Sequence, residues 1–203
     1  MRKILLLFGI LLMYISLKAQ DINHFQSRTE QFLNAQGKFI AGYTLYSTNI
    51  LSDKYYNVSN HSISLMKYVD SSVKDTMLGI IFYGSIDRGS GNSILWKYYR
   101  SIIDYDEVKN IISWIELAKQ QITKDSLIDY FSYTPKSGSL LLYITKNKDK
   151  GFLLNIQYDK YDLNSYMTLF SIDNKKSVID FVKLDDYCIK LKEIQKVIDK
   201  NKK

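Results

Sequence analysis

Cysteine, proline and histidine are scarce in this sequence: its 203 residues include one cysteine, one proline and two histidines. The single cysteine, Cys188, excludes an intramolecular disulfide, so the fold must be held by its hydrophobic core. Cys188 falls on the apolar side of an expected C-terminal helix, which predicts a buried and unreactive thiol. Neither His24 nor His61 has a partner at the HxxxH or CxxC spacing of a zinc site, so we expect no metal and no cofactor.

The sequence also lacks the short motifs of common catalytic and nucleotide-binding sites. No serine stands in a GxSxG elbow, although a triad that assembles in space stays open as an alternative. Gly89 and Gly91 precede an expected strand and lack the GxxxxGK[ST] pattern, which favours a hairpin turn over a phosphate-binding loop. Asp159, Asp162 and Asn164 have a calcium-like spacing but lack the glycine and the distal glutamate of an EF-hand loop.

Long apolar runs are missing after the N-terminus. Arg2 and Lys3 precede an apolar stretch over residues 4–15, and Ala19 is a small residue at an acceptable cleavage site. The stretch is too short to span a membrane comfortably, which predicts a signal peptide over residues 1–19, with an uncleaved anchor as the alternative. We therefore expect residues 20–203 to form a single domain that is periplasmic or secreted, with no transmembrane segment after cleavage.

Positive charge exceeds negative charge, but the excess is local. The chain carries a net charge of +7, and removing the three basic residues of the signal peptide leaves +4. Residues 190–203 alone account for +4, so the body of the domain is close to neutral. This distribution does not indicate a basic groove for nucleic acid, and we expect no nucleic-acid partner.

The clearest helix signal in the mature chain spans about residues 104–122. Trp114 and Leu117 widen an apolar face that has the 3-and-4 spacing of a helix. Asp104 is a suitable N-cap, and Glu107 three residues later completes a capping-box pattern. The face itself consists of Val108, Ile111, Ile112, Ile115, Ala118 and Ile122. Because such a face must be buried, we expect this central helix to cover the neighbouring strands.

About eight strand candidates flank this helix at intervals of roughly a dozen residues, which is typical of antiparallel meanders. They lie at about 38–46, 61–69, 76–86, 94–103, 127–134, 140–145, 152–158 and 166–172. A second helix follows at about 175–199, while residues 21–36 read as either helix or strand. We therefore predict an α+β fold with an antiparallel, curved sheet of about eight strands covered by the two helices. Strands and then a helix occur twice, which suggests a distant duplication, although no residue-level repeat supports one.

Several segments resemble a family of small exported proteins of Bacteroidetes-type bacteria that have no characterised function. They are the signal peptide ending in KAQ, residues 103–107 (IDYDE) leading into a helix, residues 130–138 (YFSYTPKSG), and a Leu- and Lys-rich C-terminal helix. The resemblance covers about residues 95–200, and the turn at 135–138 has less glycine than that family's turn. It implies export and an α+β fold, and it implies no activity.

Tyrosine is the unusual feature of the composition, with seventeen residues. Rings with a polar tip are favoured at interfaces and sugar-binding faces, and we select Tyr98, Tyr99, Tyr158 and Tyr161 as candidate binding residues. The alternative explanation is the β-propensity of tyrosine in a half-buried sheet.

These observations lead to a functional hypothesis with one enzymatic competitor, besides a third possibility, a structural or envelope-stress component with no small ligand. We expect an exported, non-enzymatic binding or interaction module of the bacterial cell envelope, whose partner is an envelope protein or a glycan, with no catalytic residues assigned. The competing hypothesis is an envelope hydrolase that uses carboxylates and His61, since clustered acids such as Asp104, Asp106 and Glu107 could face one cleft.

Overall fold

A computed structural model describes residues 26–50, 58–87, 96–124, 129–148, 151–172, 174–175, 178–179 and 181–202. The predicted signal peptide, His24 and the Gly89–Gly91 turn lie outside these residues. No helix within the described ranges is long and apolar enough to cross a membrane.

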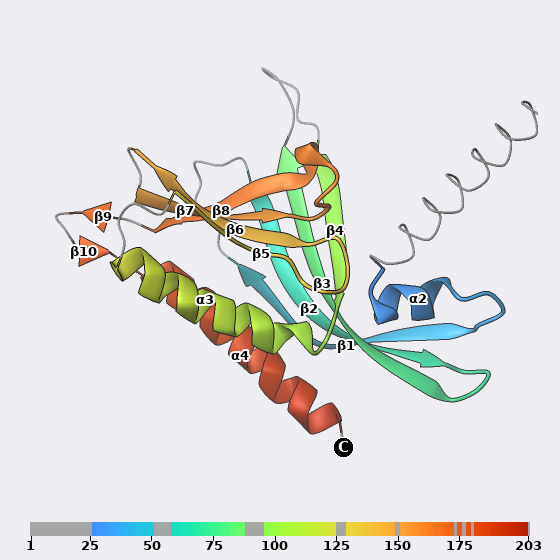
Figure 1. The fold of residues 1–203 in the computed structure, drawn as a ribbon. Helices are drawn as coiled ribbons and strands as arrows, with labels where there is room; N and C mark the ends of the chain where they lie inside the picture. The colour runs from blue at the N-terminus through green and yellow to red at the C-terminus, as the bar shows by residue number, and fades with distance from the viewer. Residues whose placement is uncertain are drawn as a thin grey trace, which may run out of the picture.

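The first half of the chain is a four-stranded meander followed by a helix (Figure 1). A short helix, α2 (Arg28–Asn34), comes first. The four strands pair antiparallel in chain order and lead into helix α3 (Glu107–Lys124). They are β1 (Ile40–Ile50), β2 (Val58–Asp70), β3 (Asp75–Asp87) and β4 (Trp96–Asp104).

The second half repeats this order. Four further strands form a second antiparallel meander, which the chain leaves through the helix α4 (Val182–Asn201). The strands are β5 (Tyr130–Tyr133), β6 (Leu141–Asn147), β7 (Gly151–Gln157) and β8 (Tyr166–Ile172). A 3₁₀ turn, η2 (Leu163–Ser165), precedes β8, and a two-stranded ribbon of β9 (Asn174–Lys175) and β10 (Val178–Ile179) precedes α4.

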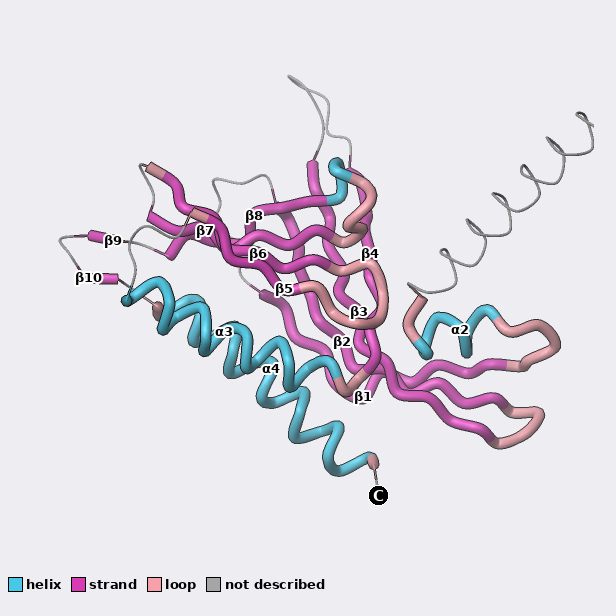
Figure 2. Tube along the Cα trace, in the orientation of Figure 1, coloured by secondary structure: helices cyan, strands magenta, loops and turns pink. Residues whose placement is uncertain are grey.

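The predicted α+β class is confirmed: eight main strands, all antiparallel, are covered by the central and C-terminal helices. The strands divide into two sheets of four instead of forming one. Figure 2 shows α3 and α4 side by side along one flank of the strands, and residues of the two helices are in contact. Helix α3 packs on β5 of the second sheet and α4 packs on β1 of the first sheet. Each helix therefore covers the first strand of the other half.

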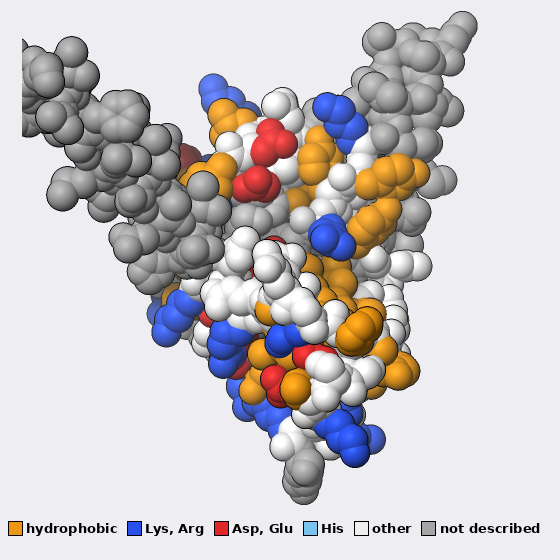
Figure 3. All heavy atoms as spheres, turned by 90° about the vertical axis from the view of Figure 1, so that its right-hand side faces the viewer, with side chains coloured by type: hydrophobic (Ala, Val, Ile, Leu, Met, Phe, Trp, Pro, Cys, Tyr) orange, Lys and Arg blue, Asp and Glu red, His pale blue; other side chains and the backbone are white. Residues whose placement is uncertain are grey.

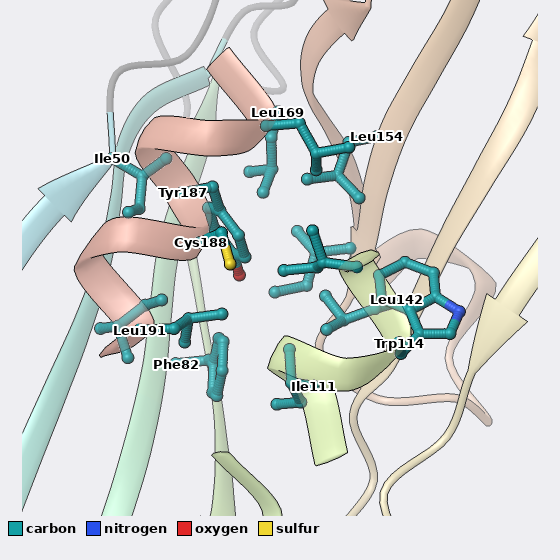
Figure 4. Packing of buried hydrophobic residues seen from close by; sticks show 14 of the residues in the cluster. Ile50, Phe82, Ile111, Trp114, Leu142, Leu154, Leu169, Tyr187, Cys188 and Leu191 are labelled. Carbon is teal, nitrogen blue, oxygen red and sulfur yellow. The ribbon is translucent and has the colours of Figure 1, made fainter. Parts of the chain in front are cut away.

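Both sheets and both helices share one hydrophobic core (Figure 4). In the first sheet the alternate positions Ile63 and Leu65 of β2 pair with Phe82 and Ile80 of β3, and all four side chains are buried. In Figure 4, Phe82, Tyr187 and Leu191 face Trp114 and Leu142 across the core. Burial of this many large apolar side chains compensates for the absence of disulfides. Cys188 is only 3 % exposed, as the sequence predicts.

The apolar face of the central helix is correctly predicted except for one residue. Leu117 is 46 % exposed and does not join the face, whereas Trp114 is buried and stacks on Phe131 of β5 with 5.9 Å between ring centroids. The C-terminal helix starts at Val182, later than expected, because the β9–β10 ribbon occupies the preceding residues. Residues 28–34 are helical, and Ser27 and Glu30 form a capping box that starts this helix.

The start of α3 differs from the prediction for a long-range reason. Asp104 belongs to β4, and its carboxylate accepts hydrogen bonds from the Thr29 amide at 3.2 Å and the Thr29 hydroxyl at 3.4 Å. The Arg28 guanidinium lies 2.9 Å from the same carboxylate. The predicted Asp104–Glu107 capping box is therefore wrong: Asp104 anchors α2 to the sheet instead of capping α3.

This anchor predicts a difference between two neighbouring aspartates. Replacing Asp104, which is 5 % exposed, with alanine leaves the Thr29 amide without its acceptor and removes one carboxylate partner of Arg28, which costs about 1–3 kcal/mol. Urea unfolding should show this loss, and hydrogen exchange should show lost protection over residues 28–34.

Asp106 provides the matched control, because its ion pair with Arg28 is exposed on both sides. Asp106→Ala should change the free energy of unfolding by about 1 kcal/mol or less. Equal losses in the two variants would contradict the assignment of Asp104 as the anchor.

Candidate functional site

The outward face of the second sheet has an unusual composition. Strand alternation places one set of side chains on this face and the opposite set in the core. We call this set the tyrosine face; it consists of Tyr130, Ser132, Leu141, Tyr143, Thr145, Asn147, Leu153, Asn155, Gln157, Tyr166, Thr168 and Ser171. None of these residues is charged, although 24 % of the whole chain is charged. The face can therefore offer aromatic surface and neutral hydrogen-bonding groups, and no ion pairs.

The strand register places three tyrosines on a diagonal across this face. Tyr130 of β5 pairs with Thr145 of β6, which stands two residues after Tyr143 on the same strand. Tyr166 of β8 pairs with Gln157 of β7, and Gln157 pairs with Leu141 of β6, two residues before Tyr143. With about 4.8 Å between strands and about 6.8 Å per two residues, the diagonal is about 20 Å long. Tyr130 and Tyr143 lie in ring contact at 5.7 Å between centroids, and Tyr130 and Tyr166 are 54 % and 47 % exposed.

A hydrogen-bonded network fixes the surface between these tyrosines. Asn155, which is 4 % exposed, donates from Nδ2 to the Thr145 hydroxyl at 3.1 Å and to the Leu153 carbonyl at 3.0 Å. The Thr168 hydroxyl donates to Asn155 Oδ1 at 2.6 Å. The network joins β6, β7 and β8, so this part of the face keeps its shape without a partner.

One phenol of the tyrosine face, that of Tyr143, stays neutral over a wide pH range. Burial raises the pKa of Tyr143 to about 12, with smaller contributions from the neighbouring Tyr166 and Tyr130. The Tyr143 phenol therefore keeps its proton near neutral pH and can both donate and accept a hydrogen bond.

Two other faces of the molecule carry charged side chains. Figure 3 shows the side that carries α2, where hydrophobic side chains are interspersed with Lys, Arg, Asp and Glu. The outward face of the first sheet includes Arg100, which pairs in register with Tyr83, and Tyr83 stacks on Tyr98 at 6.1 Å between centroids. Aromatic surface without charge is thus the distinguishing property of the tyrosine face.

The four tyrosines selected from the sequence are divided between surface and core. Tyr98 and Tyr161 are 65 % and 63 % exposed, on the first sheet and in the turn after β7. Tyr99 and Tyr158 are brought together, stacked at 6.1 Å between ring centroids, but Tyr158 is only 1 % exposed. A binding role for these four residues stays a prediction, and Tyr158 has a clear structural role.

Tyr158 forms a buried polar contact with His61. The Tyr158 hydroxyl and His61 Nδ1 lie 2.5 Å apart, and the Met167 sulfur is 3.4 Å from the same hydroxyl. The ring of Tyr187 from α4 stacks on the imidazole at 6.3 Å between centroids. His61 Nε2 and the Tyr187 hydroxyl are buried and make no hydrogen bond within the described part of the chain. The imidazole has no solvent contact, so a substrate could reach it only by opening the core.

The acidic residues near α3 are engaged in structural contacts. The Glu107 carboxylate, 4 % exposed, accepts hydrogen bonds from the Tyr133 hydroxyl at 2.6 Å and the Lys136 amide at 3.1 Å. It therefore holds the segment after β5 against the start of α3, while Asp104 holds α2. These contacts explain both buried acids without a catalytic role.

The calcium-like spacing after β7 has a similar explanation. The Asp159 carboxylate accepts from the Tyr161 amide at 3.0 Å, and that of Asp162 accepts from the Asn164 amide at 2.8 Å, so both acids shape the turn. Among the residues that the structure describes, no three His, Cys, Asp or Glu side chains are placed to hold a metal ion together.

A depression of about 360 Å³ lies between α3 and the start of α4. Its lining includes Glu116, Lys119 and Phe181. Lys119 pairs with Asp185 at 2.5 Å and Glu116 pairs with Lys192 at 3.1 Å, so these charges join the two helices. The depression is thus a seam between helices, in which Glu116 and Lys119 are already engaged in ion pairs.

Comparison with known proteins adds no relative: no family model, no curated protein and no solved structure matches the chain.

Tyr130, Tyr143 and Tyr166 are not among the candidate residues selected from the sequence. Each stands two positions before a Ser or Thr with an apolar residue between them, which is a visible signal of an outward face. The relation among the three depends on the strand register, and that is set by the turns and by a bulge between Leu154 and Asn155.

The buried imidazole predicts acid-sensitive stability. Burial lowers the pKa of His61 from 6.5 to about 3, with a small opposing effect from the Tyr83 backbone. Between these values the unfolded chain binds a proton that the folded chain excludes, so stability present above pH 6.5 is lost as the pH falls towards 3. The contribution is about 1.4 kcal/mol per pH unit.

Urea unfolding at a series of pH values measures this slope. In His61→Gln the slope between pH 6.5 and 5 should become flatter, because the titrating group is gone. Tyr158→Phe is the control: it keeps the imidazole buried and should keep the slope even if overall stability falls. A wild-type slope that is unchanged in His61→Gln would contradict the assignment.

Proposed function

We propose that this chain is an exported, non-enzymatic binding module of the bacterial cell envelope, and that the tyrosine face is its recognition surface. The observation that carries the proposal is the diagonal of Tyr130, Tyr143 and Tyr166 on a face without charge. Export rests on the basic and apolar pattern of residues 1–19.

The chemistry of the face supports binding over catalysis. Tyrosine supplies a large, rigid contact area with a polar tip and little conformational entropy to lose on binding. The buried Asn155 network keeps the surface between the rings in place before a partner arrives, which lowers the cost of association. The groups that a hydrolase would need, His61 and the acids Asp104 and Glu107, are instead buried in structural contacts.

Sedimentation with isolated envelopes of the source bacterium tests this proposal. Purified residues 20–203 should be retained by the envelopes, and a triple variant with Tyr130, Tyr143 and Tyr166 replaced by alanine should bind at least about tenfold more weakly. The estimate follows from about 0.5–1.5 kcal/mol for each aromatic ring that the variant removes from the binding surface.

Tyr43→Ala is the matched control, because Tyr43 is 56 % exposed on β1 of the other sheet. It should be retained like the wild type. Circular dichroism and thermal unfolding establish that each variant is folded, and Tyr130→Ala alone, which removes the most exposed of the three rings, should give a smaller loss. Equal retention of the wild type and the triple variant would contradict the proposal.

A further inference from the structure

The partner of the tyrosine face can be narrowed by its chemistry. We infer that the tyrosine face binds a neutral glycan chain lying along the diagonal from Tyr130 through Tyr143 to Tyr166; this inference rests on the proposed function above. The diagonal of about 20 Å is long enough for a chain of several sugar rings to contact all three tyrosines.

The absence of charge on the tyrosine face favours a neutral ligand. The tyrosine face has no charged residue. A ligand bearing carboxylates, sulfates or phosphates would lose hydration there without gaining an ion pair, which is costly. A lipid surface rich in anionic headgroups is disfavoured for the same reason, since such surfaces are recognised through clustered Lys and Arg. A neutral ligand matches this face.

The mixture of aromatic and neutral polar side chains on the tyrosine face suits a sugar. Sugar rings present apolar C–H faces and a rim of hydroxyls, so they require flat aromatic surface beside neutral donors and acceptors. Tyr130 and Tyr166 are half exposed and end in polar phenols, and the exposed hydroxyl side chain of Ser132 pairs in register with Tyr143 of the neighbouring strand. The face therefore offers both kinds of contact within one strand spacing.

The small aliphatic surface of the tyrosine face favours a glycan over a protein partner or a second copy of the chain. Protein interfaces have a fully buried apolar centre, enriched in aromatic residues, Met and Arg. On the tyrosine face the aliphatic side chains are Leu141 and Leu153, and both are already partly buried. The face therefore lacks the exposed aliphatic centre on which a protein interface is built.

Chemical treatment of the envelopes distinguishes these partners. Periodate cleaves the vicinal diols of sugars, whereas a protease digests proteins and leaves glycans. Retention of the wild-type chain should fall at least about tenfold on periodate-treated envelopes and should survive protease treatment. It should also change less than about twofold between roughly 50 mM and 500 mM salt, because no ion pairs contribute. The Tyr43→Ala variant should follow the wild type in every condition.

The other outcomes of these treatments would contradict either the glycan inference alone or the proposed binding function as well. Retention that depends on the three tyrosines but is abolished by protease and survives periodate would overturn the glycan inference and leave the proposed function standing. Retention that falls steeply with salt would also overturn the inference, in favour of a charged ligand. Retention of the triple variant equal to the wild type would overturn both.

Discussion

The two halves of the chain meet at Gly84. A Cβ atom at this position would overlap the Tyr158 hydroxyl and lie 2.5 Å from the Met167 methyl carbon, so only glycine lets the second sheet approach the first so closely. Gly84 pairs with His61 on one side and Tyr99 on the other, and Tyr158 contacts both of these neighbours. This contact brings the inner faces of the two sheets together and buries His61.

The close approach of the two sheets at Gly84 determines which side chains of the second sheet face outward. Once the inner side chains of β5–β8 are in the shared core, strand alternation leaves the opposite set facing outward. The two helices contribute by covering each other's half, with α3 on β5 and α4 on β1, and by the ion pairs Lys119–Asp185 and Lys192–Glu116 between them. Each half thus depends on the other for its core, although both have the same order of four strands and a helix.

Much of the fold was predictable because it follows from local patterns. Local patterns in the sequence indicate which residues are buried. Such patterns are the apolar spacing of α3, the alternation of β2 and the turns that separate the strands. The start of α3 was mispredicted because Asp104 and Glu107 match a capping box, whereas their partners, Thr29 and Tyr133, are distant in sequence. Long-range hydrogen bonds of this kind leave no periodic signal in the sequence.

The candidate site was less predictable for the same reason. Pairs of adjacent tyrosines such as Tyr98 and Tyr99 are conspicuous in the sequence, yet adjacent strand residues point to opposite faces. Tyr130, Tyr143 and Tyr166 are separated in the chain and become neighbours only through the register of β5, β6, β7 and β8. An uncharged face is a property of the assembled sheet, and composition along the chain does not reveal it.

The most direct measurement of the central claim is nuclear magnetic resonance of the protein with ¹³C-labelled tyrosine rings, titrated with a soluble neutral polysaccharide fraction from the same envelopes. If the tyrosine face binds a neutral glycan, the ring signals of Tyr130, Tyr143 and Tyr166 should shift together and saturate, while the signals of Tyr43, Tyr98 and Tyr161 should stay unchanged. Shifts confined to Tyr98 and Tyr161, or no shift at saturating polysaccharide, would contradict glycan binding by this face.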